Sequence, residues 1–284
     1  MFVSEKLVFT ELHKTGGTHI SNWLSKLVGG EQIGKHNRIP PAYWDRFIIG
    51  SIRNPWDWYV SLWAFGCGGQ GSVYRETTRR IDIKYLNRQL HSEMGLPRPR
   101  PGQWIRQFWH DARKPVAKWA SLYSDYSDST AFRAWVRMML DPARRFDMAE
   151  GFGFSPLARG FGLMTYRYLK LFTRLGDELY RDGTLQTLQG IRSVWLKKKL
   201  VNFVIRNEYL EQDMLKALGT AGISLPEQER TALLEASGKR TNTSRHLSVG
   251  HYYDKETIDL IFDREPLIIE QYGYEPPDIL YKEA

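Results

Sequence analysis

Two short segments of this chain carry the residue types that hold anions in proteins. The first reads KTGGT, from Lys14 to Thr18, and it follows the apolar run KLVFTEL, which predicts a β-strand. A helix that begins at this turn directs free backbone N–H groups and the positive end of its dipole at an anion. Gly16 and Gly17 let the backbone approach that anion closely. Lys14 adds a positive charge, and Thr15 and Thr18 add hydroxyl donors.

The lysine of this turn stands before the glycines. A Walker loop has the pattern G-x-x-x-x-G-K-[ST], in which the final hydroxyl holds Mg²⁺. That spacing is absent from KTGGT, which argues against a magnesium-nucleoside triphosphate as the ligand. An ordinary turn between a strand and a helix is the alternative interpretation.

The second segment reads FIIGSIRNPWDWYVSLW. Arg53 ends its apolar strand, and Ser61 lies eight positions later in a predicted helix that begins near Pro55. The carboxyl ends of parallel strands border one crevice, so Arg53 and Ser61 are expected to face it together. A guanidinium fork suits a phosphate group, and the hydroxyl is a second donor. A surface ion pair is the alternative role for an arginine at a strand end.

The segments between and around these motifs predict an α/β fold with a central parallel sheet flanked by helices. A helix is expected from about Thr18 to Val28, and strands at EQIGK and RFIIGSI. Further along, STAFRAWVRMML is typical of an amphipathic helix, and VNFVIRNEYLEQDMLKALG of a strand that runs into a helix ending at Gly219. A last helix is expected from about Asp254 to Tyr272.

We expect these elements to form a single domain over residues 1–284. Residues 1–65 form its first half, residues 66–199 an inserted and mainly helical region, and residues 200–284 a strand, a loop and helices that complete the core. The inserted region is rich in Arg, Trp and Tyr.

The composition favours anionic partners without specifying them. The chain has 40 Lys+Arg against 32 Asp+Glu, a net charge of +8. Cys67 is the only cysteine, which excludes an intrachain disulfide or a Cys-rich metal site and favours a reducing compartment. The start, MFVSEKLVFTEL, lacks the basic residues and longer apolar core of a signal peptide, and no apolar run predicts a transmembrane segment. We therefore expect a cytoplasmic protein.

Together the two segments resemble the sulfotransferase family that uses 3′-phosphoadenosine 5′-phosphosulfate. The family's first motif, matched by Lys14, Thr15, Gly16, Gly17 and Thr18, binds the 5′-phosphosulfate. Its second motif, matched by Arg53 and Ser61, binds the 3′-phosphate. The resemblance implies a P-loop NTPase-like fold and transfer of a sulfuryl group from this donor to a hydroxyl of an acceptor. The sulfuryl group carries less charge than a phosphoryl group, so no metal is expected.

The resemblance extends more weakly to the last part of the chain. VNFVIRNEYLEQD is similar to a later strand and acidic turn of the family, and TNTSRH with the following helix to the carboxyl-terminal region of bacterial and carbohydrate-modifying members. Relatives close this loop over the nucleotide, which implies contacts from Ser244 and Arg245; a solvated linker is the alternative. His19 falls where cytosolic members carry a tryptophan that stacks on adenine, so it is a candidate for contact with the base.

Catalysis requires charge stabilisation and a base. Lys14 is the candidate for stabilising the bridging oxygen as the sulfuryl group departs. His36 is the candidate base, because GKHNRIPPAYWDRFIIGSIRNP resembles the Lys-x-His stretch before the Arg strand of cytosolic members, although Lys35 here adjoins His36 directly. A surface histidine is the alternative for His36. Glu11 or a carboxylate of the inserted region is the next candidate base, and His13 either points into the site or caps the strand.

The acceptor is expected to bind in the inserted region. Its tryptophans and arginines suit stacking on a ring and attraction to an acidic group, although tryptophans are more often core residues: Trp104, Trp109, Trp119, Trp135, Arg98, Arg100, Arg106 and Arg113. A small molecule, a lipid head group and a glycan all fit as the acceptor, and a homo-oligomer is compatible with the sequence. A small-molecule kinase and a basic nucleic-acid-binding protein are alternatives; the second does not explain the paired anion motifs, so no nucleic-acid partner is expected.

Overall fold

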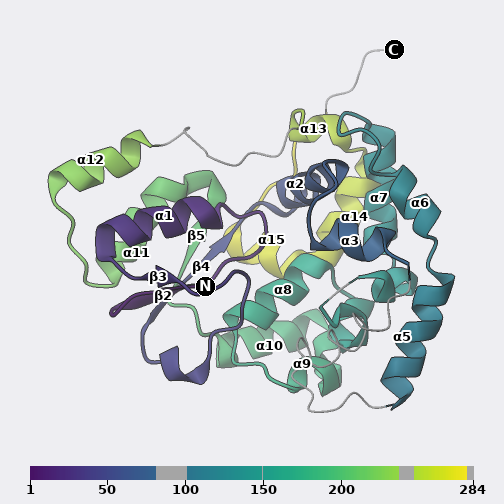
Figure 1. Cartoon of the computed structure of the whole chain (residues 1–284), viewed down its shortest axis with the longest axis horizontal. Coiled ribbons are helices and arrows are strands. Elements are labelled where there is room, and N and C mark those ends of the chain that lie inside the picture. Colours follow the sequence, from purple (N-terminus) through teal and green to yellow (C-terminus); the bar gives the residue numbers. More distant parts are fainter. Residues whose placement is uncertain (81–100, 149, 237–245, 280–284) are drawn as a thin grey trace. The chain divides into compact units, whose positions relative to one another are not determined.

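The chain folds into two compact units, each built from segments that are distant in the sequence (Figure 1). The structure is a computed structural model that describes residues 1–80, 101–148, 150–236 and 246–279. The first unit comprises residues 1–54, 167–174 and 195–243. The second comprises residues 55–166, 175–194 and 244–284. The expectation of a single domain over residues 1–284 stays a prediction.

The first unit contains a five-stranded mixed sheet flanked by helices, with strand order β3-β1-β2-β4-β5. Its strands are β1 (Phe2–Val3), β2 (Leu7–Phe9), β3 (Glu31–Gln32), β4 (Phe47–Ile52) and β5 (Phe203–Arg206). The strands β2, β4 and β5 are parallel, whereas β1 is antiparallel to both β2 and β3. The α/β class is confirmed, but the sheet is not parallel throughout. Only three residues join β1 to β2, which is too short for a crossover connection.

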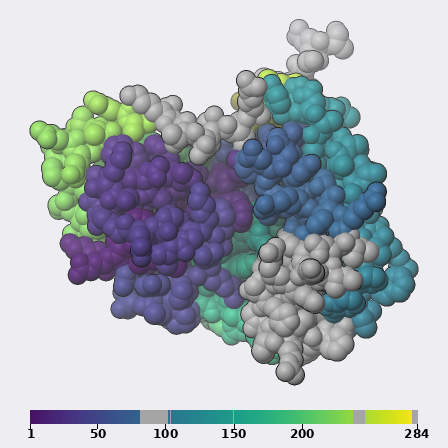
Figure 2. Space-filling view, viewed as in Figure 1, coloured from purple at the N-terminus to yellow at the C-terminus, as the bar shows by residue number. Residues whose placement is uncertain are grey.

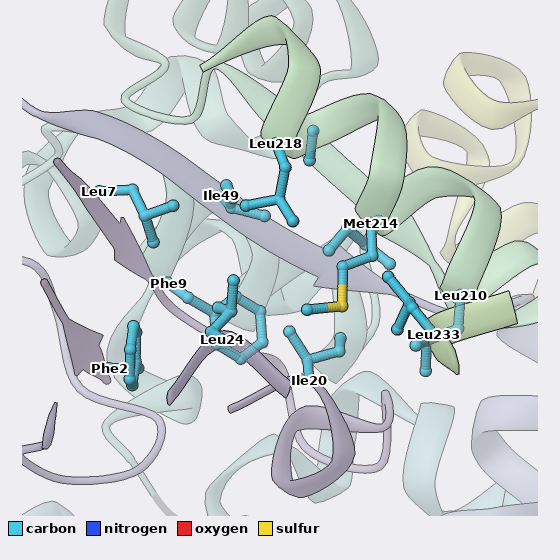
Figure 3. Packing of buried hydrophobic residues seen from close by; sticks show 12 residues of the cluster. Phe2, Leu7, Phe9, Ile20, Leu24, Ile49, Leu210, Met214, Leu218 and Leu233 are labelled. Carbon is cyan, nitrogen blue, oxygen red and sulfur yellow. The ribbon is translucent and has the colours of Figure 1, made fainter. Parts of the chain in front are cut away.

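One face of this sheet packs on helices α1 (Gly17–Val28) and α11 (Leu210–Thr220). Side chains alternate along a strand, so Phe9, Ile49 and Ile205 project from the same face. Figure 3 shows them in one apolar cluster with side chains of the two helices. The outer side of α1 is solvent exposed, and this helix forms part of the surface in Figure 2. This packing fixes the start of α1 over the carboxyl end of β2.

The opposite face packs on the last residues of α8 (Leu163–Phe172). A Cβ atom added to Gly50 of β4 would lie 2.7 Å from the Phe172 ring, so the glycine allows this close approach. The chain therefore leaves β2 along one face and returns to β5 along the other. In open α/β sheets ligands bind at the carboxyl ends of the strands where such a change of side occurs, which here are the ends of β2 and β4.

The remaining elements of the first unit are short. They are η1 (Pro41–Tyr43), the end of α10 (Leu188–Lys198), η7 (Asn207–Tyr209) and α12 (Glu227–Glu235).

The named elements of the second unit are all helical within the part of the chain that the structure describes. Its longer helices are α2 (Pro55–Cys67), α3 (Ser72–Thr78), α5 (Pro101–Arg113), α6 (Val116–Ser121), α7 (Ser129–Leu140), α14 (Lys255–Arg264) and α15 (Pro266–Tyr272). Shorter turns are η3 (Pro142–Asp147), η4 (Phe152–Phe154), η5 (Pro156–Arg159), α9 (Glu178–Arg181), η6 (Gly183–Gln186) and α13 (Val249–Tyr252). In the described segments no helix has the length and apolar character needed to cross a membrane.

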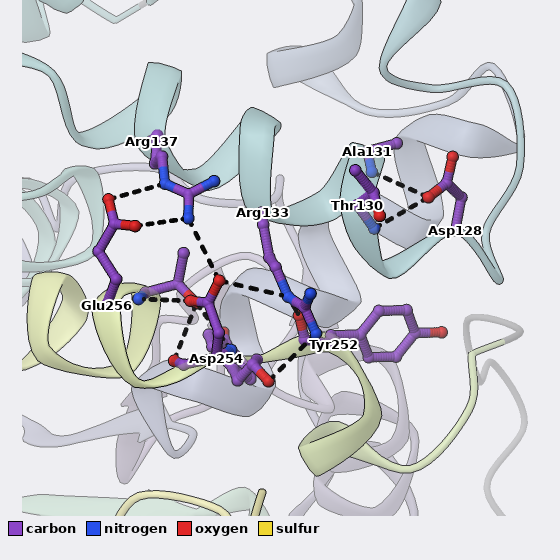
Figure 4. A network of polar contacts seen from close by, with 10 residues as sticks. Asp128, Thr130, Ala131, Arg133, Arg137, Tyr252, Asp254 and Glu256 are labelled. Atoms are coloured by element: carbon purple, nitrogen blue, oxygen red, sulfur yellow. Dashed lines mark hydrogen bonds and ion pairs between the residues drawn. The ribbon is translucent and has the colours of Figure 1, made fainter. Parts of the chain in front are cut away.

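An ionic network joins α7 to the start of α14 (Figure 4). Arg137 donates from Nε and Nη2 to the two carboxylate oxygens of Glu256 at 2.9 and 2.8 Å. It also reaches Asp254, the N-cap residue of α14, at 3.2 Å. Arg133 on the same face of α7 donates to the Tyr252 carbonyl at 3.0 Å. The bidentate geometry fixes the direction in which the two helices meet.

The helix expected from Asp254 to Tyr272 is two helices, because the chain breaks at Glu265 and Pro266. The Glu265 side chain is fully buried and accepts hydrogen bonds from the Tyr59 hydroxyl at 2.5 Å and from the Thr165 N–H and hydroxyl at 2.8 and 2.6 Å. Burial raises the pKa of the Glu265 carboxyl to about 7, against hydrogen bonds that favour its charged form. The second unit therefore contains a carboxyl group that folding keeps protonated at mildly acidic pH.

This buried carboxyl predicts a pH dependence of stability. Its folded pKa lies above the unfolded value of 4.5, so the folded state binds more protons between pH 4.5 and about 7. The Glu265 contribution is therefore complete below pH 4.5 and is lost as the pH rises through about 7, on the order of 3 kcal/mol in all. We expect Glu265→Gln to remove most of this slope in urea denaturation at pH 5 and pH 7.5. If the unfolding free energy of Glu265→Gln changed between these two pH values by as much as that of the unchanged protein, the prediction would be wrong.

Candidate functional site

The turn before α1 contains two residues with left-handed backbone conformation. Lys14 and Gly16 both lie in the left-handed region, with φ of 63° and 78°. Gly16 is the N-cap residue, so the capping position has no side chain to close the helix end. The first N–H groups of a helix lack partners within it, and they favour a negative charge. The predicted turn and the helix after it are therefore present, with the helix starting one residue earlier than expected.

Packing within the first unit requires both glycines. A Cβ atom at Gly16 would lie 2.8 Å from the Leu210 side chain, and its positive φ also disfavours other residues. A Cβ atom at Gly17 would lie 1.2 Å from a carboxylate oxygen of Glu11. The two glycines thus allow the turn to lie against η7 and α11 and leave room for Glu11 at the helix start. From the sequence, by contrast, the only role predicted for these glycines is to let the backbone approach a ligand.

Thr15 ties the turn to the neighbouring strand. Its buried hydroxyl donates to the Leu12 carbonyl at 2.8 Å and lies 2.7 Å from the Ser51 hydroxyl of β4. Because the single hydroxyl proton of Thr15 goes to Leu12, Ser51 is the donor in this pair. The Thr15 side chain, expected to donate to an anion, instead holds the turn on the sheet. The predicted contact between Thr15 and a cofactor therefore rests on the Thr15 backbone N–H, and it stays a prediction.

Lys14 and Arg53 come together at the carboxyl ends of adjacent strands. Arg53 follows β4 directly, and its Nη1 donates to the Lys14 carbonyl at 3.3 Å. The next N–H, of Asn54, donates to Glu208 at 2.7 Å and so fixes the chain after Arg53. Burial, with a further contribution from the Arg53 charge, lowers the pKa of Lys14 to about 8. The fold therefore concentrates positive charge beside the start of α1.

Lys35 brings a further positive charge to the same place. Its Nζ donates to the hydroxyl of Thr18, the second residue of α1, at 3.2 Å. The segment that carries Lys35 follows β3, which runs in the same direction as β2 with β1 between them. The Lys35 side chain was not among the predicted site residues. The position of Lys35 next to the predicted base His36 was the sequence feature that could have identified it as a site residue.

His36, the predicted base, contacts Glu11 and His13. Its Nδ1 is 3.1 Å from the Glu11 carbonyl, and its ring stacks on that of His13 with centroids 3.5 Å apart. A carbonyl only accepts hydrogen bonds, so in the neutral ring Nδ1 carries the proton and Nε2 carries the lone pair. His13 adjoins Lys14, and the stack therefore places His36 near this lysine. His36 and His13 are both half-buried, so the role of His36 as a base and its alternative as a surface histidine both stay predictions.

Glu11, the second candidate base, is also at this site. Its carboxylate is buried beside Gly17, and one oxygen, Oε1, has no hydrogen-bond partner among the described residues. Burial raises the pKa of Glu11 above its ordinary value, while the positive charge of Lys35 opposes the shift. A buried carboxylate without a donor is costly. Both proton acceptors that the sequence suggests therefore lie around the same turn.

The remaining residues predicted to contact the cofactor lie in different environments, and two of them lie outside the described residues. His19 on α1 lies 3.3 Å from the buried carboxylate of Glu211 on α11, and its contact with an adenine base stays a prediction. Ser61 is buried on α2 of the second unit. Ser244 and Arg245 lie outside the described residues. No group of three or more His, Cys, Asp or Glu side chains in the described ranges has the arrangement of a metal site.

Two of the tryptophans expected to stack on an acceptor are core residues. Trp119 is fully buried and donates to Asp147 at 2.9 Å, and Trp135 is fully buried and donates to the Tyr123 hydroxyl at 2.6 Å. That expectation is wrong for these two, because buried indole rings fill the second unit's interior. Trp109 is exposed, with the Arg113 guanidinium 5.4 Å from its ring. Arg98 and Arg100 lie outside the described residues.

Comparisons of the chain with protein-family models, curated proteins and solved structures give no match in any of the three.

The Thr15–Ser51 contact predicts an energetic coupling between the turn and β4. Thr15→Val leaves the Leu12 carbonyl and the Ser51 hydroxyl buried without a partner, which costs about 1–3 kcal/mol. Ser51→Ala alone costs less, because Thr15 keeps its bond to Leu12. In urea denaturation we expect the loss of unfolding free energy in the double variant, Thr15→Val with Ser51→Ala, to be smaller than the sum of the two single losses by at least about 0.5 kcal/mol. Strict additivity would contradict the coupling, and Ser25→Ala on the exposed side of α1 is the control.

Proposed function

We propose that this chain is a sulfotransferase of the P-loop-like kind, which transfers a sulfuryl group from 3′-phosphoadenosine 5′-phosphosulfate to a hydroxyl of an acceptor. The observation that supports it most is the convergence of Lys14 and Arg53 at the start of α1, where the pKa of Lys14 is lowered to about 8. Like charges gathered at the positive end of a helix dipole oppose one another, so a polyanion bound there is strongly favoured.

The residues fit the two anionic groups of this donor. In the proposal, the backbone N–H groups from Gly16 to Thr18, with the Lys14 and Lys35 side chains, hold the 5′-phosphosulfate. Arg53 holds the 3′-phosphate with its guanidinium fork, and Ser61 is its expected partner. The Lys14 carbonyl that Arg53 contacts links the two motifs directly. Contacts of His19, Ser244 and Arg245 with the nucleotide belong to the same proposal.

The donor supplies a sulfuryl group bound through a bridging oxygen to a phosphate that leaves as part of 3′,5′-phosphoadenosine. Lys14 is placed to stabilise the negative charge that develops on this oxygen, an interaction stronger in the transition state than before it. His36 takes the proton of the acceptor hydroxyl on Nε2, because its Nδ1–H is directed at the Glu11 carbonyl. The proton that the acceptor hydroxyl loses as the sulfate ester forms is thus held on His36.

Glu11 has a supporting role in this scheme. Its carbonyl orients the His36 ring, and its buried carboxylate lies beside the start of α1 and near Lys35. The carbonyl keeps the Nδ1 proton of His36 in place, which leaves Nε2 to accept the proton of the acceptor. The chain's own residues thus provide both the base and the group that orients it.

Removal of either cation is expected to weaken donor binding. Lys14→Ala and Arg53→Ala should each weaken binding of 3′,5′-phosphoadenosine at least about tenfold in metal-free calorimetry, because each loses a charge-assisted contact. Turnover with labelled donor should fall further for Lys14→Ala. In the unchanged protein, affinity should decline as the pH rises above about 8, where Lys14 loses its charge in the free protein.

Lys26→Ala is the matched control, since this lysine lies in the last turn of α1. Full binding and turnover by both Lys14→Ala and Arg53→Ala would contradict the proposal. Magnesium-dependent binding of ATP, without binding of 3′,5′-phosphoadenosine, would favour a small-molecule kinase.

Replacement of the base should affect the rate more than donor affinity. We expect His36→Ala to lower kcat by about 10²- to 10⁴-fold, the usual contribution of general base catalysis, with little change in the affinity for 3′,5′-phosphoadenosine. His251→Ala in the second unit is the control. An unchanged rate in His36→Ala, together with a large loss in Glu11→Gln, would assign the base to Glu11 instead.

A further inference from the structure

The second unit has a cavity of about 360 Å³ whose lining is strongly basic. Arg106 of α5, Arg145 of η3 and Arg159 of η5 line it, and within the described part of the chain none of its lining residues is acidic. The aromatic rings of Phe146 and Phe154 form an apolar part of its wall. Neither the proposed donor site nor its mechanism uses any of these residues.

The wall of this cavity is well defined by packing. Phe146 and Phe154 meet edge to face with ring centroids 5.2 Å apart. A Cβ atom at Gly153 would lie 2.6 Å from the Phe146 ring, so the η4 turn lies close against η3. Arg145 donates to the Pro142 carbonyl at 2.7 Å, and its guanidinium lies 4.6 Å from the centre of the Phe146 ring. Its position is therefore set before any ligand arrives.

The three arginines repel one another, and no carboxylate among the described residues forms an ion pair with them. Burial lowers the pKa of Arg145, and the charges of Arg159 and Arg106 lower it further. No salt bridge joins any of the three to an acidic side chain in the described part of the chain, and Arg159 has only a long 3.5 Å contact with the Gln186 side chain. Nearby Asp147 bonds instead to Trp119 and Arg144. An anion in the cavity would relieve this repulsion.

We propose that this cavity binds the oxyanion group of a small ligand of about monosaccharide size. Ligand pockets span about 300–1,000 Å³, and this one lies near the lower end, which excludes a long polymer within it. Guanidinium forks recognise carboxylate, sulfate and phosphate groups alike, and the phenyl rings pack on the apolar face of a sugar ring. The proposal is independent of the sulfotransferase assignment, because the cavity lies within the second unit and Lys14 and Arg53 lie in the first.

The test uses calorimetry on the full chain at constant ionic strength. The probes are glucuronate, glucose 6-phosphate and inorganic sulfate, with glucose as the neutral control. We expect the charged sugars to bind and glucose not to bind; preference between the first two probes distinguishes a planar from a tetrahedral oxyanion. Equal affinity for glucose and for both charged sugars would overturn the proposal.

Substitutions assign that binding to the cavity. Arg106→Gln and Arg159→Gln are exposed changes that preserve folding, and each should weaken binding of the preferred charged sugar about tenfold or more. Arg181→Gln is the matched control, an exposed arginine of the same unit paired with Asp177. Arg106→Glu should abolish binding yet raise Tm, because it introduces a carboxylate among the remaining arginines.

Two results would overturn the proposal at this stage. One is retention of binding in both Arg106→Gln and Arg159→Gln. The other is loss of charged-sugar binding in Lys14→Ala, which would place the site in the first unit. Loss of 3′,5′-phosphoadenosine binding in Lys14→Ala with charged-sugar binding retained supports both proposals. Failure of 3′,5′-phosphoadenosine to bind the unchanged protein affects the proposed function alone.

Discussion

The buried hydrogen bond between Thr15 and Ser51 is the contact on which the candidate site depends. It joins the turn after β2 to the adjacent parallel strand, two residues before Arg53. Through it the start of α1, the ammonium group of Lys14 and the guanidinium of Arg53 share one edge of the sheet. A hydroxyl pair is suited to this task because each oxygen both donates and accepts, so the close approach of two backbones leaves no polar atom unpaired.

The fold brings positive charge together at two separate places. At the start of α1 the packing of turn and strand concentrates Lys14, Lys35 and Arg53, and in the second unit one helix and two short helical turns concentrate Arg106, Arg145 and Arg159. Each arrangement is unfavourable for the free protein, and in each the shift in pKa has burial as its main cause. Like charges held close together oppose folding. In the α7–α14 network, by contrast, opposite charges pair within the protein.

Local patterns predicted the elements well where one segment supplies all of the information. The helix at Ser129–Leu140 and the start of α2 at Pro55 agree with the expectation, because apolar periodicity and a proline in the first turn act within the segment itself. Errors arose where partners are distant. The antiparallel β1 was missed, and the expected Asp254–Tyr272 helix is broken because Glu265 turns inward to Tyr59 and Thr165.

The sequence by itself determined the two candidate anion-binding motifs, the apolar strands that precede them and the identity of two candidate bases, since these features depend on residue type and short-range spacing. Only the tertiary structure decided that Thr15 turns to Ser51, that His36 stacks on His13 above the Glu11 carbonyl, and that three arginines from separate helical elements line one cavity. Such contacts join residues far apart along the chain. Their geometry is set by how strands pair and helices pack, which no local pattern encodes.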